Sequence, residues 1–331
     1  MPKVVTFGEV MMRLSPKGNG RFLQAADFDA LYAGSEANVA ASLSYLGVSS
    51  THVTAFPDND LGKAAAYQMR QHGVGIDHIV HQEGRIGVYF IEHGASIRSP
   101  KIIYDRFDSC FARLDPESFD WEEILHGAEW FHWSGITPAI SASAAESCKQ
   151  AILTARKNGV KISGDINYRR NLWQYGKTAR DIMPELIEPC DIIIAGLTDL
   201  ENCLGITAPN LEEACGKLVS KYPAITHVST THRTTIDSSY QTLQGVLWNG
   251  KQMLETRTYN LSPIVDRVGA GDAFMGGLIY GFIRKFSDQE VVDFATAACA
   301  LKHTIEGDVN VSTVAEIEAV VKGEHVGKLL R

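Results

Sequence analysis

The segment 265–277 restricts the possible structure of this chain more than any other segment does. In it, two glycines separate a short extended run from a long apolar segment over 273–283. Gly269 and Gly271 can adopt backbone angles that other residues avoid, so successive backbone N–H groups can point toward one place. The first N–H groups of the following helix and the positive end of its dipole add to the same place. The segment therefore predicts an anion-binding site made of backbone N–H groups from Gly269, Ala270 and Gly271.

Asp272 places a carboxylate at the entrance of this predicted anion site. The carboxylate would repel an anion unless it takes part in chemistry there. Asp is also a favoured N-cap residue, so on local grounds a purely structural role at the start of the helix is an equal alternative. Two better-known glycine motifs do not apply. A dinucleotide fingerprint would need glycine at Phe274, and Asn171 stands where a Walker loop ending in Gly176-Lys177-Thr178 would need its first glycine.

Composition excludes several classes of protein. The chain has 331 residues, of which 45% are hydrophobic and 21% charged, as in an ordinary globular protein with one large α/β domain or two smaller ones. Its net charge of −8 argues against non-specific binding of nucleic acid or anionic membranes. No apolar run is long enough for a membrane span, and the N-terminus passes directly into a strand-like segment, so we expect no signal peptide and no membrane partner.

The cysteines are scattered, without a Cys-x-x-Cys pair or a His/Cys cluster at zinc-finger spacing. We therefore expect reduced, buried thiols in a cytoplasmic protein, and no structural metal site. The six are Cys110, Cys148, Cys190, Cys203, Cys215 and Cys299.

Strand-like and helix-like segments alternate along most of the chain, which predicts parallel β-α-β construction. One compact α/β domain over residues 1–331 fits this pattern best. The predicted strands are 3–9, 51–56, 129–133, 160–165, 190–195 and 225–229, followed by a more antiparallel patch at 243–248 and 252–259. The predicted helices are 39–46, 60–71 with Asp60 as its cap, 141–158, 179–187, 211–221, 273–284, 288–305 and 314–322.

The alternation is interrupted twice. Residues 11–32 are polar and poorly periodic, and 86–92 and 101–106 look like two strands of a hairpin. Excursions from a β-α-β core often cover a site, so we expect segments 11–32 and 85–107 to form a small β lid. Ligands of open parallel sheets bind beyond the carboxyl ends of the strands, where the polar sets 134–138, 165–169 and 269–272 should converge.

Over its whole length the sequence resembles the ribokinase-like family of carbohydrate kinases. Residues 266–274 are similar to the C-terminal signature Asp-Thr-x-Gly-Ala-Gly-Asp-x-Phe of that family, and 34–38 to its N-terminal glycine/asparagine motif. Within the family the resemblance is closest to the 2-keto-3-deoxygluconate kinases, through segments 104–106, 134–139 and 165–173. It implies a three-layer α/β sandwich with a mostly parallel central sheet and a small β lid.

The resemblance also implies a reaction, the ATP-dependent phosphorylation of the terminal hydroxyl of 2-keto-3-deoxygluconate. Asp272 would accept the proton of the attacking hydroxyl, and Gly269, Ala270 and Gly271 would hold the phosphoryl oxygens. The helix N-terminus is expected to lower the basicity of Asp272, and a weak base suffices where the proton leaves late. Mg²⁺ would be held mainly by phosphate oxygens and water, without a dedicated protein cage.

The carboxylate of a sugar acid calls for arginine, whose planar fork matches it. Arg106 and Arg169 are the candidates that the resemblance selects, beside the plainer alternative of a solvated surface charge for each. Tyr89 and Tyr104 would present hydroxyls from the predicted hairpin, or would simply pack on the core. The other implied contacts with the sugar are Gly34, Asn38 and Asp308. Weaker candidates for the nucleotide site are Asn167, Arg233, Lys302 and His303, and the last two could instead face solvent.

The sequence departs from the family pattern in three places. Gly196-Leu197-Thr198-Asp199 replaces an Asn-x-x-Glu motif, the nucleotide loop near 229–233 lacks its usual glycines, and Arg267 replaces a threonine. Other readings are a fructokinase or ribokinase, a catalytically weak sugar-acid-binding protein, and a structural oligomer subunit that leaves Asp272 without a role. We expect a homo-oligomer, because the family resemblance suggests self-association and a hairpin offers an edge for pairing.

Overall fold

A ten-stranded sheet forms the centre of the computed structural model, which describes residues 3–324. Its strand order is β13-β12-β11-β10-β9-β8-β1-β4-β5, with β14 paired to β12, and the run from β11 to β5 is parallel throughout. The parallel strands are β1 (Lys3–Phe7), β4 (Ser49–Pro57), β5 (Ile79–Gln82), β8 (Trp130–Ser134), β9 (Lys161–Asp165), β10 (Ile192–Ile194) and β11 (His227–Thr235). The antiparallel patch comprises β12 (Gln241–Trp248), β13 (Met253–Glu255) and β14 (Tyr259–Leu261).

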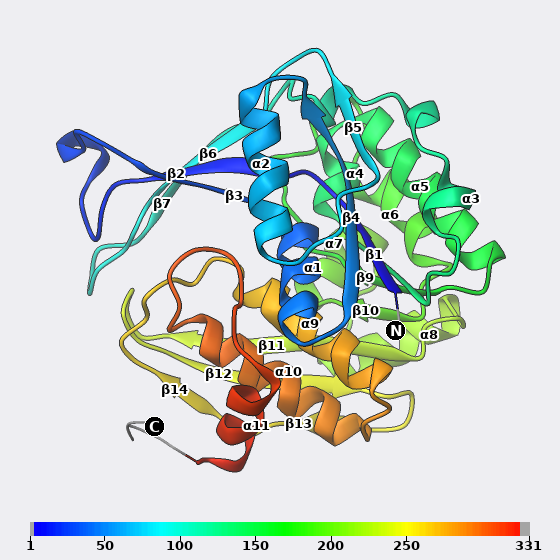
Figure 1. The fold of residues 1–331 in the computed structure, drawn as a ribbon. Helices are drawn as coiled ribbons and strands as arrows, with labels where there is room; N and C mark the ends of the chain where they lie inside the picture. Colours follow the sequence, from blue (N-terminus) through cyan, green and yellow to red (C-terminus); the bar gives the residue numbers. More distant parts are fainter. Residues whose placement is uncertain (1–2, 325–331) are drawn as a thin grey trace.

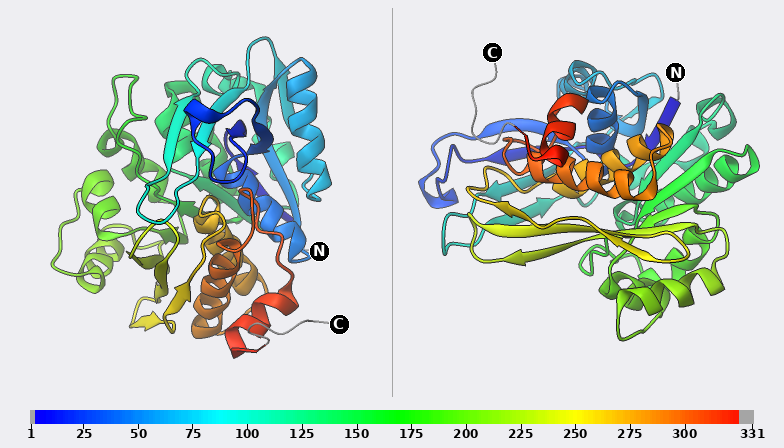
Figure 2. Two further views of the ribbon diagram at one scale, coloured as in Figure 1. Left: turned by 90° about the vertical axis from the view of Figure 1, so that its left-hand side faces the viewer. Right: turned by 90° about the horizontal axis from the view of Figure 1, so that it is seen from below.

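Helices cover both faces of this sheet, which makes three layers (Figures 1 and 2). Val4 packs toward one face and Val5 toward the other, because successive side chains of a strand point to opposite sides. The Val4 face is covered by α1 (Ser35–Tyr45), α9 (Ala270–Ile283), α10 (Asp288–Lys302) and α11 (Val314–Lys322). The Val5 face is covered by α5 (Ala142–Lys157), α6 (Ala179–Ile187), α7 (Leu197–Leu204) and α8 (Leu211–Lys221). Burial on both faces explains the nearly continuous apolar runs of the inner strands.

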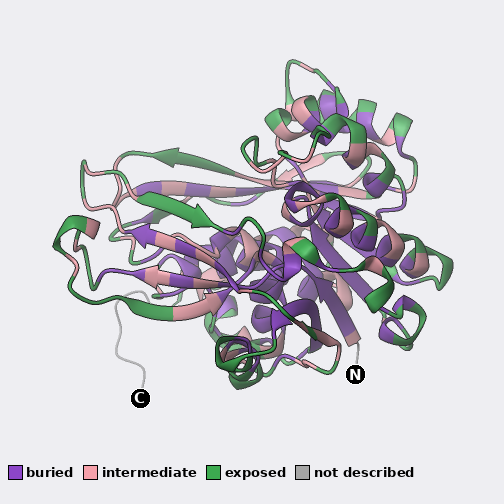
Figure 3. Cartoon of the chain, turned by 90° about the horizontal axis from the view of Figure 1, so that it is seen from above, coloured by how far each residue is buried: buried purple, intermediate pink, exposed green. Residues whose placement is uncertain are grey.

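A second, smaller sheet projects from the first, as the interrupted alternation predicts. It has the order β3-β2-β6-β7 and consists of β2 (Met11–Ser15), β3 (Asp29–Ala33), β6 (Gly87–Glu92) and β7 (Lys101–Asp105). Strand β7 is exposed along its whole length, and the view coloured by burial shows the contrast with the buried central strands (Figure 3). That this sheet acts as a lid stays a prediction.

Most predicted elements are found, and the differences have local causes. Helix α7 was not predicted, because it has only eight residues and begins after Gly196. Helix α2 (Asp60–Gln71) is capped by Asn59, whose Oδ1 accepts the N–H groups of Leu61 and Gly62, so the prediction of Asp60 as the cap is wrong. Helix α9 begins three residues earlier than predicted, at Ala270.

The remaining short elements are α3 (Trp121–Ile124), α4 (Ile136–Ile140) and the 3-10 turns Phe22–Gln24, Phe111–Arg113 and Pro116–Ser118. None of the described helices is both long enough and apolar enough to cross a membrane.

Candidate active site

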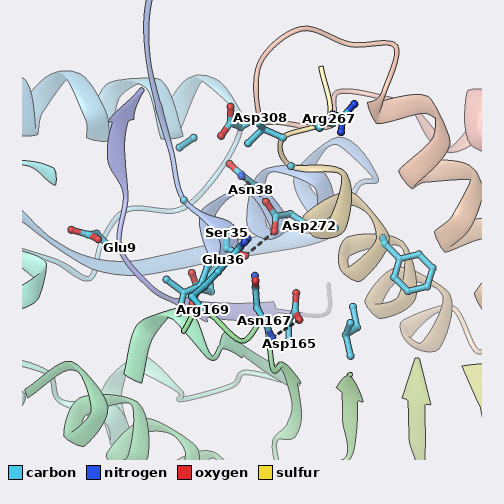
Figure 4. Close-up of a pocket in the computed structure, with 18 of the residues that line it drawn as sticks. Glu9, Ser35, Glu36, Asn38, Asp165, Asn167, Arg169, Arg267, Asp272 and Asp308 are labelled. Atoms are coloured by element: carbon cyan, nitrogen blue, oxygen red, sulfur yellow. Dashed lines mark hydrogen bonds between the residues drawn. The ribbon is translucent and has the colours of Figure 1, made fainter. Parts of the chain in front are cut away.

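A cavity of about 650 Å³ opens where the carboxyl end of β9, the N-termini of α1 and α9, and the small sheet meet. The polar segments at the ends of the parallel strands therefore converge as predicted (Figure 4). Of the predicted site residues, those that line the cavity are Gly34, Asn38, Tyr89, Tyr104, Arg106, Asn167, Arg169, Arg233, Gly269, Gly271, Asp272 and Asp308. Ala270 does not line it, because its side chain is fully buried at the start of α9.

Asp272 is the third residue of α9 and is not its N-cap, which is Gly269. Its carboxylate is held by α1: Ser35 Oγ donates to Oδ1 and Asn38 Nδ2 donates to Oδ2, each at 2.7 Å (Figure 4). The two hydrogen bonds fix the orientation of the carboxylate at the cavity wall. This geometry removes the purely structural N-cap alternative for Asp272.

The surrounding protein raises the pKa of Asp272 to about 6, mainly because burial disfavours the charged form. The nearby Asp308 carboxylate acts in the same direction, whereas Asn38, Ser35 and Arg169 partly oppose it. The expectation that the helix N-terminus lowers the basicity of Asp272 is therefore wrong, because burial outweighs it. A carboxylate with this pKa is a better proton acceptor near neutral pH than an ordinary aspartate.

The predicted anion site has its N–H groups available at the start of α9. Gly269 adopts a positive φ of 78°, and a Cβ added to it would lie 1.7 Å from the carbonyl oxygen of Asp308, so only glycine fits. Within residues 3–324 the N–H groups of Gly269, Gly271 and Asp272 have no hydrogen-bond partner, whereas that of Ala270 bonds to the carbonyl of Arg267 at 3.4 Å. The three residues with free N–H groups line the cavity that Asn38 and Ser35 also border.

The two predicted carboxylate-binding arginines are in different environments. Arg106 is buried and already paired, with Nη2 at 2.5 Å and Nε at 2.8 Å from Glu9 Oε2. Arg169 is exposed and lines the cavity, and among the described residues its guanidinium makes no hydrogen bond or salt bridge. Arg169 is therefore the arginine that is free to bind an anionic substrate. Glu9 was missed by sequence reasoning, since nothing local links it to a residue 97 positions away.

Tyr89 and Asp308 contact each other, because Tyr89 Oη donates to Asp308 Oδ2. Burial and the Asp308 carboxylate raise the pKa of Tyr89 well above its ordinary value, so the hydroxyl keeps its proton. Tyr104 on the neighbouring strand is 46% exposed, with its ring 6.0 Å from that of Tyr89. Both tyrosines thus border the cavity from the small sheet.

Further carboxylates border the cavity that were not predicted as site residues. Burial and the neighbouring Asp199 and Asp272 raise the pKa of Asp165 to about 8. Asp165 accepts the N–H of Asn167, and Asp199 accepts the N–H of Gly196 and so caps α7. No group of three or more described acidic, His or Cys residues has the arrangement of a metal site.

Glu36 is a further carboxylate that was not predicted as a site residue, and it belongs to the N-terminal glycine/asparagine motif. Its Oε1 accepts hydrogen bonds from the Ser134 backbone and hydroxyl and from the Thr137 hydroxyl. Burial raises its pKa to about 7. Glu36 thereby attaches the first turn of α1 to the end of β8.

The residues predicted for the nucleotide site fall into two groups, those that line the cavity and those that are buried behind it. Arg233 on β11 lines the cavity with Thr230, Thr231 and Arg267. Lys302 and His303 are fully buried, so the alternative that they face solvent is wrong. The Lys302 ammonium donates to the carbonyls of Asp266 and Ile305, at 3.4 and 3.0 Å, behind the glycine segment.

Comparison with known proteins identifies the family. A family model described as pfkB family carbohydrate kinase matches residues 1–313. A 2-dehydro-3-deoxygalactonokinase of Haloferax volcanii is 32% identical over 327 residues, which cover 98% of each chain. A 2-dehydro-3-deoxygluconokinase of Thermoproteus tenax is 26% identical over 93% of this chain and 90% of that protein.

Among solved structures, a 2-dehydro-3-deoxygluconokinase of Thermotoga maritima is 42% identical, with a TM-score of 0.93 and coverage of 97% of this chain and 98% of that one. The comparisons confirm the predicted α/β sandwich and the predicted resemblance. Because the family model matches nearly the whole chain, including the segments that build the cavity, the protein belongs to the pfkB family of carbohydrate kinases.

Proposed function

We propose that this protein phosphorylates the terminal hydroxyl of 2-keto-3-deoxygluconate with ATP and gives 2-keto-3-deoxy-6-phosphogluconate. The observation that carries the proposal is one cavity that holds an oriented base, free backbone N–H groups and an unpaired arginine. These are the groups that a kinase of an acidic sugar needs. The names of the relatives from Thermotoga maritima and Thermoproteus tenax support the same substrate.

Each group has a defined task in this proposal. Asp272 accepts the proton of the sugar hydroxyl as that oxygen attacks the γ-phosphorus, and the free N–H groups at the start of α9 stabilise the phosphoryl oxygens. Arg169 binds the carboxylate of the sugar acid. Gly34, Asn38, Tyr89, Tyr104, Arg106 and Asp308 shape the sugar site, and Asn167 and Arg233 border the nucleotide.

Mg²⁺ fits the charge distribution of the cavity. Asp165 and Asp199 border it, and the pKa of Asp165 is raised by burial and by the neighbouring Asp199 and Asp272 carboxylates, so a cation there would be favoured. They would hold the ion through water, with phosphate oxygens as its direct ligands. When bound with ATP, Mg²⁺ neutralises charge on the phosphate oxygens.

The main alternative functions differ in the sugar that is phosphorylated. The Haloferax volcanii relative is named for the galactose-derived acid, so that acid belongs in every assay. A fructokinase or ribokinase would have no use for the unpaired Arg169. A weak sugar-acid-binding protein remains a further alternative, because Gly196 stands where the family has asparagine.

Turnover of both keto-deoxy acids, fructose and ribose with ATP and Mg²⁺ tests the proposal. We expect kcat/KM for 2-keto-3-deoxygluconate to exceed that for the neutral sugars by at least about 100-fold, as is typical for losing a charged contact. Equal or better turnover of fructose or ribose would defeat the sugar-acid assignment. Ligand binding without phosphate transfer would favour the binding protein.

Three broader predictions accompany this function. We propose one domain over residues 1–331 with lid segments 11–32 and 85–107, since both segments border the cavity through the small sheet. We propose a homo-oligomer, supported by the fully exposed edge strand β7. A cytoplasmic location is supported by six cysteines that are all free and buried.

A further inference from the structure

Arg13 is a buried arginine of strand β2 that lies between two carboxylates. Only 1% of the residue is exposed. Its Nη2 is 2.7 Å from Asp266 Oδ2, its Nη1 donates to Asp308 Oδ1, and His93 Nε2 lies 3.0 Å from Nη2. A buried guanidinium that bridges two separate carboxylates connects the segments that carry them.

Those two carboxylates belong to loops on either side of the predicted anion site. Asp266 Oδ1 accepts the N–H of Val268 at 3.0 Å, and Oδ2 accepts the N–H of Gly307 at 3.2 Å. The carbonyl of Asp308 packs directly against Gly269. The position of Asp266 therefore fixes the start of the glycine segment, and the position of Asp308 limits where Gly269 can lie.

The bridge also reaches the small sheet. Arg13 on β2 and Tyr89 on β6 are direct partners in the sheet register, so their side chains leave the sheet on one face. Both reach Asp308. Figure 1 shows the loop that contains Asp308, in red, rising from the end of α10 toward this sheet. Asp308 thus contacts the small sheet through its carboxylate and the glycine segment through its backbone carbonyl.

The charges in this buried cluster balance. Arg13 and Lys302 are positive and Asp266 and Asp308 are negative, and all four are at most 4% exposed. Removing Arg13 would leave two buried carboxylates facing one ammonium, beside the place where phosphate oxygens would bind. Breaking a buried ion pair by removing one partner is strongly unfavourable, and here the uncompensated charge would also repel phosphate.

We infer that Arg13 is a positioning residue for the phosphoryl transfer proposed above: by bridging Asp266 and Asp308 it holds the Gly269–Gly271 anion site in register with the sugar-binding face of the small sheet. Arg13 does not border the cavity itself, so it acts through the two carboxylates. No local pattern marks it, because its partners lie 253 and 295 residues away along the chain.

The test compares full-length Arg13→Met and Arg13→Lys with wild type, using 2-keto-3-deoxygluconate, ATP and Mg²⁺. We expect Arg13→Met to lower kcat by about 100-fold, the loss typical of a misplacement of about 1 Å, with KM for ATP changed by less than about 3-fold. Arg13→Lys keeps the charge but cannot bridge both carboxylates, so it should lose roughly 10-fold. Lys17→Met is the matched control, because Lys17 forms an exposed ion pair with Asp27 in the connection between β2 and β3 of the small sheet. The kcat of this variant should equal that of wild type.

The pH profile distinguishes positioning from general stabilisation. The groups that face Asp272 are Ser35 and Asn38 from α1, Asp165 at the end of β9, Arg169 after it, Asp308, and Cys299 and Lys302 from α10. In Arg13→Met the charge of Asp308 is no longer offset, so the acid limb of kcat/KM should move to higher pH. In Arg13→Lys it should stay near that of wild type.

Wild-type kcat and an unmoved acid limb in Arg13→Met, with only a lower melting temperature, would overturn the inference. If Arg13→Met does not fold, Arg13→Lys with wild-type kcat would overturn it equally. Failure of the proposed function gives a different result, because the wild type itself would then not phosphorylate 2-keto-3-deoxygluconate. The same variants would then be compared on the sugar that the wild type does phosphorylate.

Discussion

Asn38 Nδ2 lies 2.7 Å from Asp272 Oδ2, so helix α1 holds a carboxylate in the first turn of helix α9. The two residues are 234 positions apart in the chain. The side-chain Nδ2 of Asn38 donates to Asp272, while Oδ1 of the same amide is buried without a hydrogen-bond partner among the described residues. A buried acceptor next to the base is a natural partner for a substrate hydroxyl.

Replacing the base should abolish most of the activity. Asp272→Asn keeps the size of the side chain but cannot accept a proton, so we expect kcat to fall by roughly 100- to 10,000-fold with little change in melting temperature. The measurement is steady-state turnover with both substrates saturating. Full activity in this variant would remove the proposed mechanism, whatever the sugar.

Activity should depend on pH through Asp272. Its pKa is raised to about 6, so the carboxyl gains a proton as the pH falls through that value and can no longer act as a base. We expect kcat/KM to be nearly constant above pH 7 and to fall tenfold per pH unit well below pH 6. A profile that is flat down to pH 4.5 would contradict the assignment of Asp272 as the base.

Ser35→Ala should move the acid limb of the pH profile of kcat/KM. The Ser35 hydroxyl donates to the charged form of Asp272, so its removal favours protonation and shifts the limb upward by about one pH unit. Ser44→Ala is the control, because Ser44 lies at the other end of α1 and contacts Ser50 and Gly73. An unchanged limb in Ser35→Ala would show that this hydrogen bond does not tune the base.

The two arginines should give opposite phenotypes. Arg169→Met removes an unpaired cation, so KM for the sugar acid should rise roughly 10- to 100-fold while the melting temperature stays near that of wild type. Arg106→Met leaves Glu9 buried without its partner, so we expect a destabilisation of about 3 kcal/mol. Arg170→Met, at an exposed position beside Arg169, is the control for KM. A larger rise in KM for Arg170→Met than for Arg169→Met would show that the carboxylate binds elsewhere.

Gly269→Ala should disrupt the fold of the glycine segment and abolish activity. The added Cβ would overlap the carbonyl of Asp308, and the positive φ is unfavourable for alanine. Gly271→Ala is the informative companion, because a Cβ there meets nothing within 4 Å. We expect Gly271→Ala to fold normally, as judged by thermal unfolding, and to lose activity because the methyl group projects into the anion site. Normal activity in Gly271→Ala would place the phosphate elsewhere.

Local sequence was enough to predict the glycine segment, because Gly269, Gly271 and Asp272 form their site within four residues. Alternation of strands and helices was enough for the parallel β-α-β construction, and its interruption for the second sheet, whereas the three layers were implied by the family resemblance. Pairings between distant segments were not predictable in this way. Nothing near Arg13 or Glu9 indicates that each neutralises a partner from another element, and the burial that raises the pKa of Asp272 arises only when α1 and α9 pack together.

Glu36 joins the first turn of α1 to the end of β8, and α1 in turn orients Asp272. The two hydrogen bonds that orient the base therefore come from a helix anchored to the main sheet. Movement of the small sheet that keeps the Arg13 bridge intact would change access to the sugar pocket while the Ser35 and Asn38 hydrogen bonds to Asp272 stay in place. Product could leave and fresh sugar enter while the proton acceptor stays assembled for the next cycle.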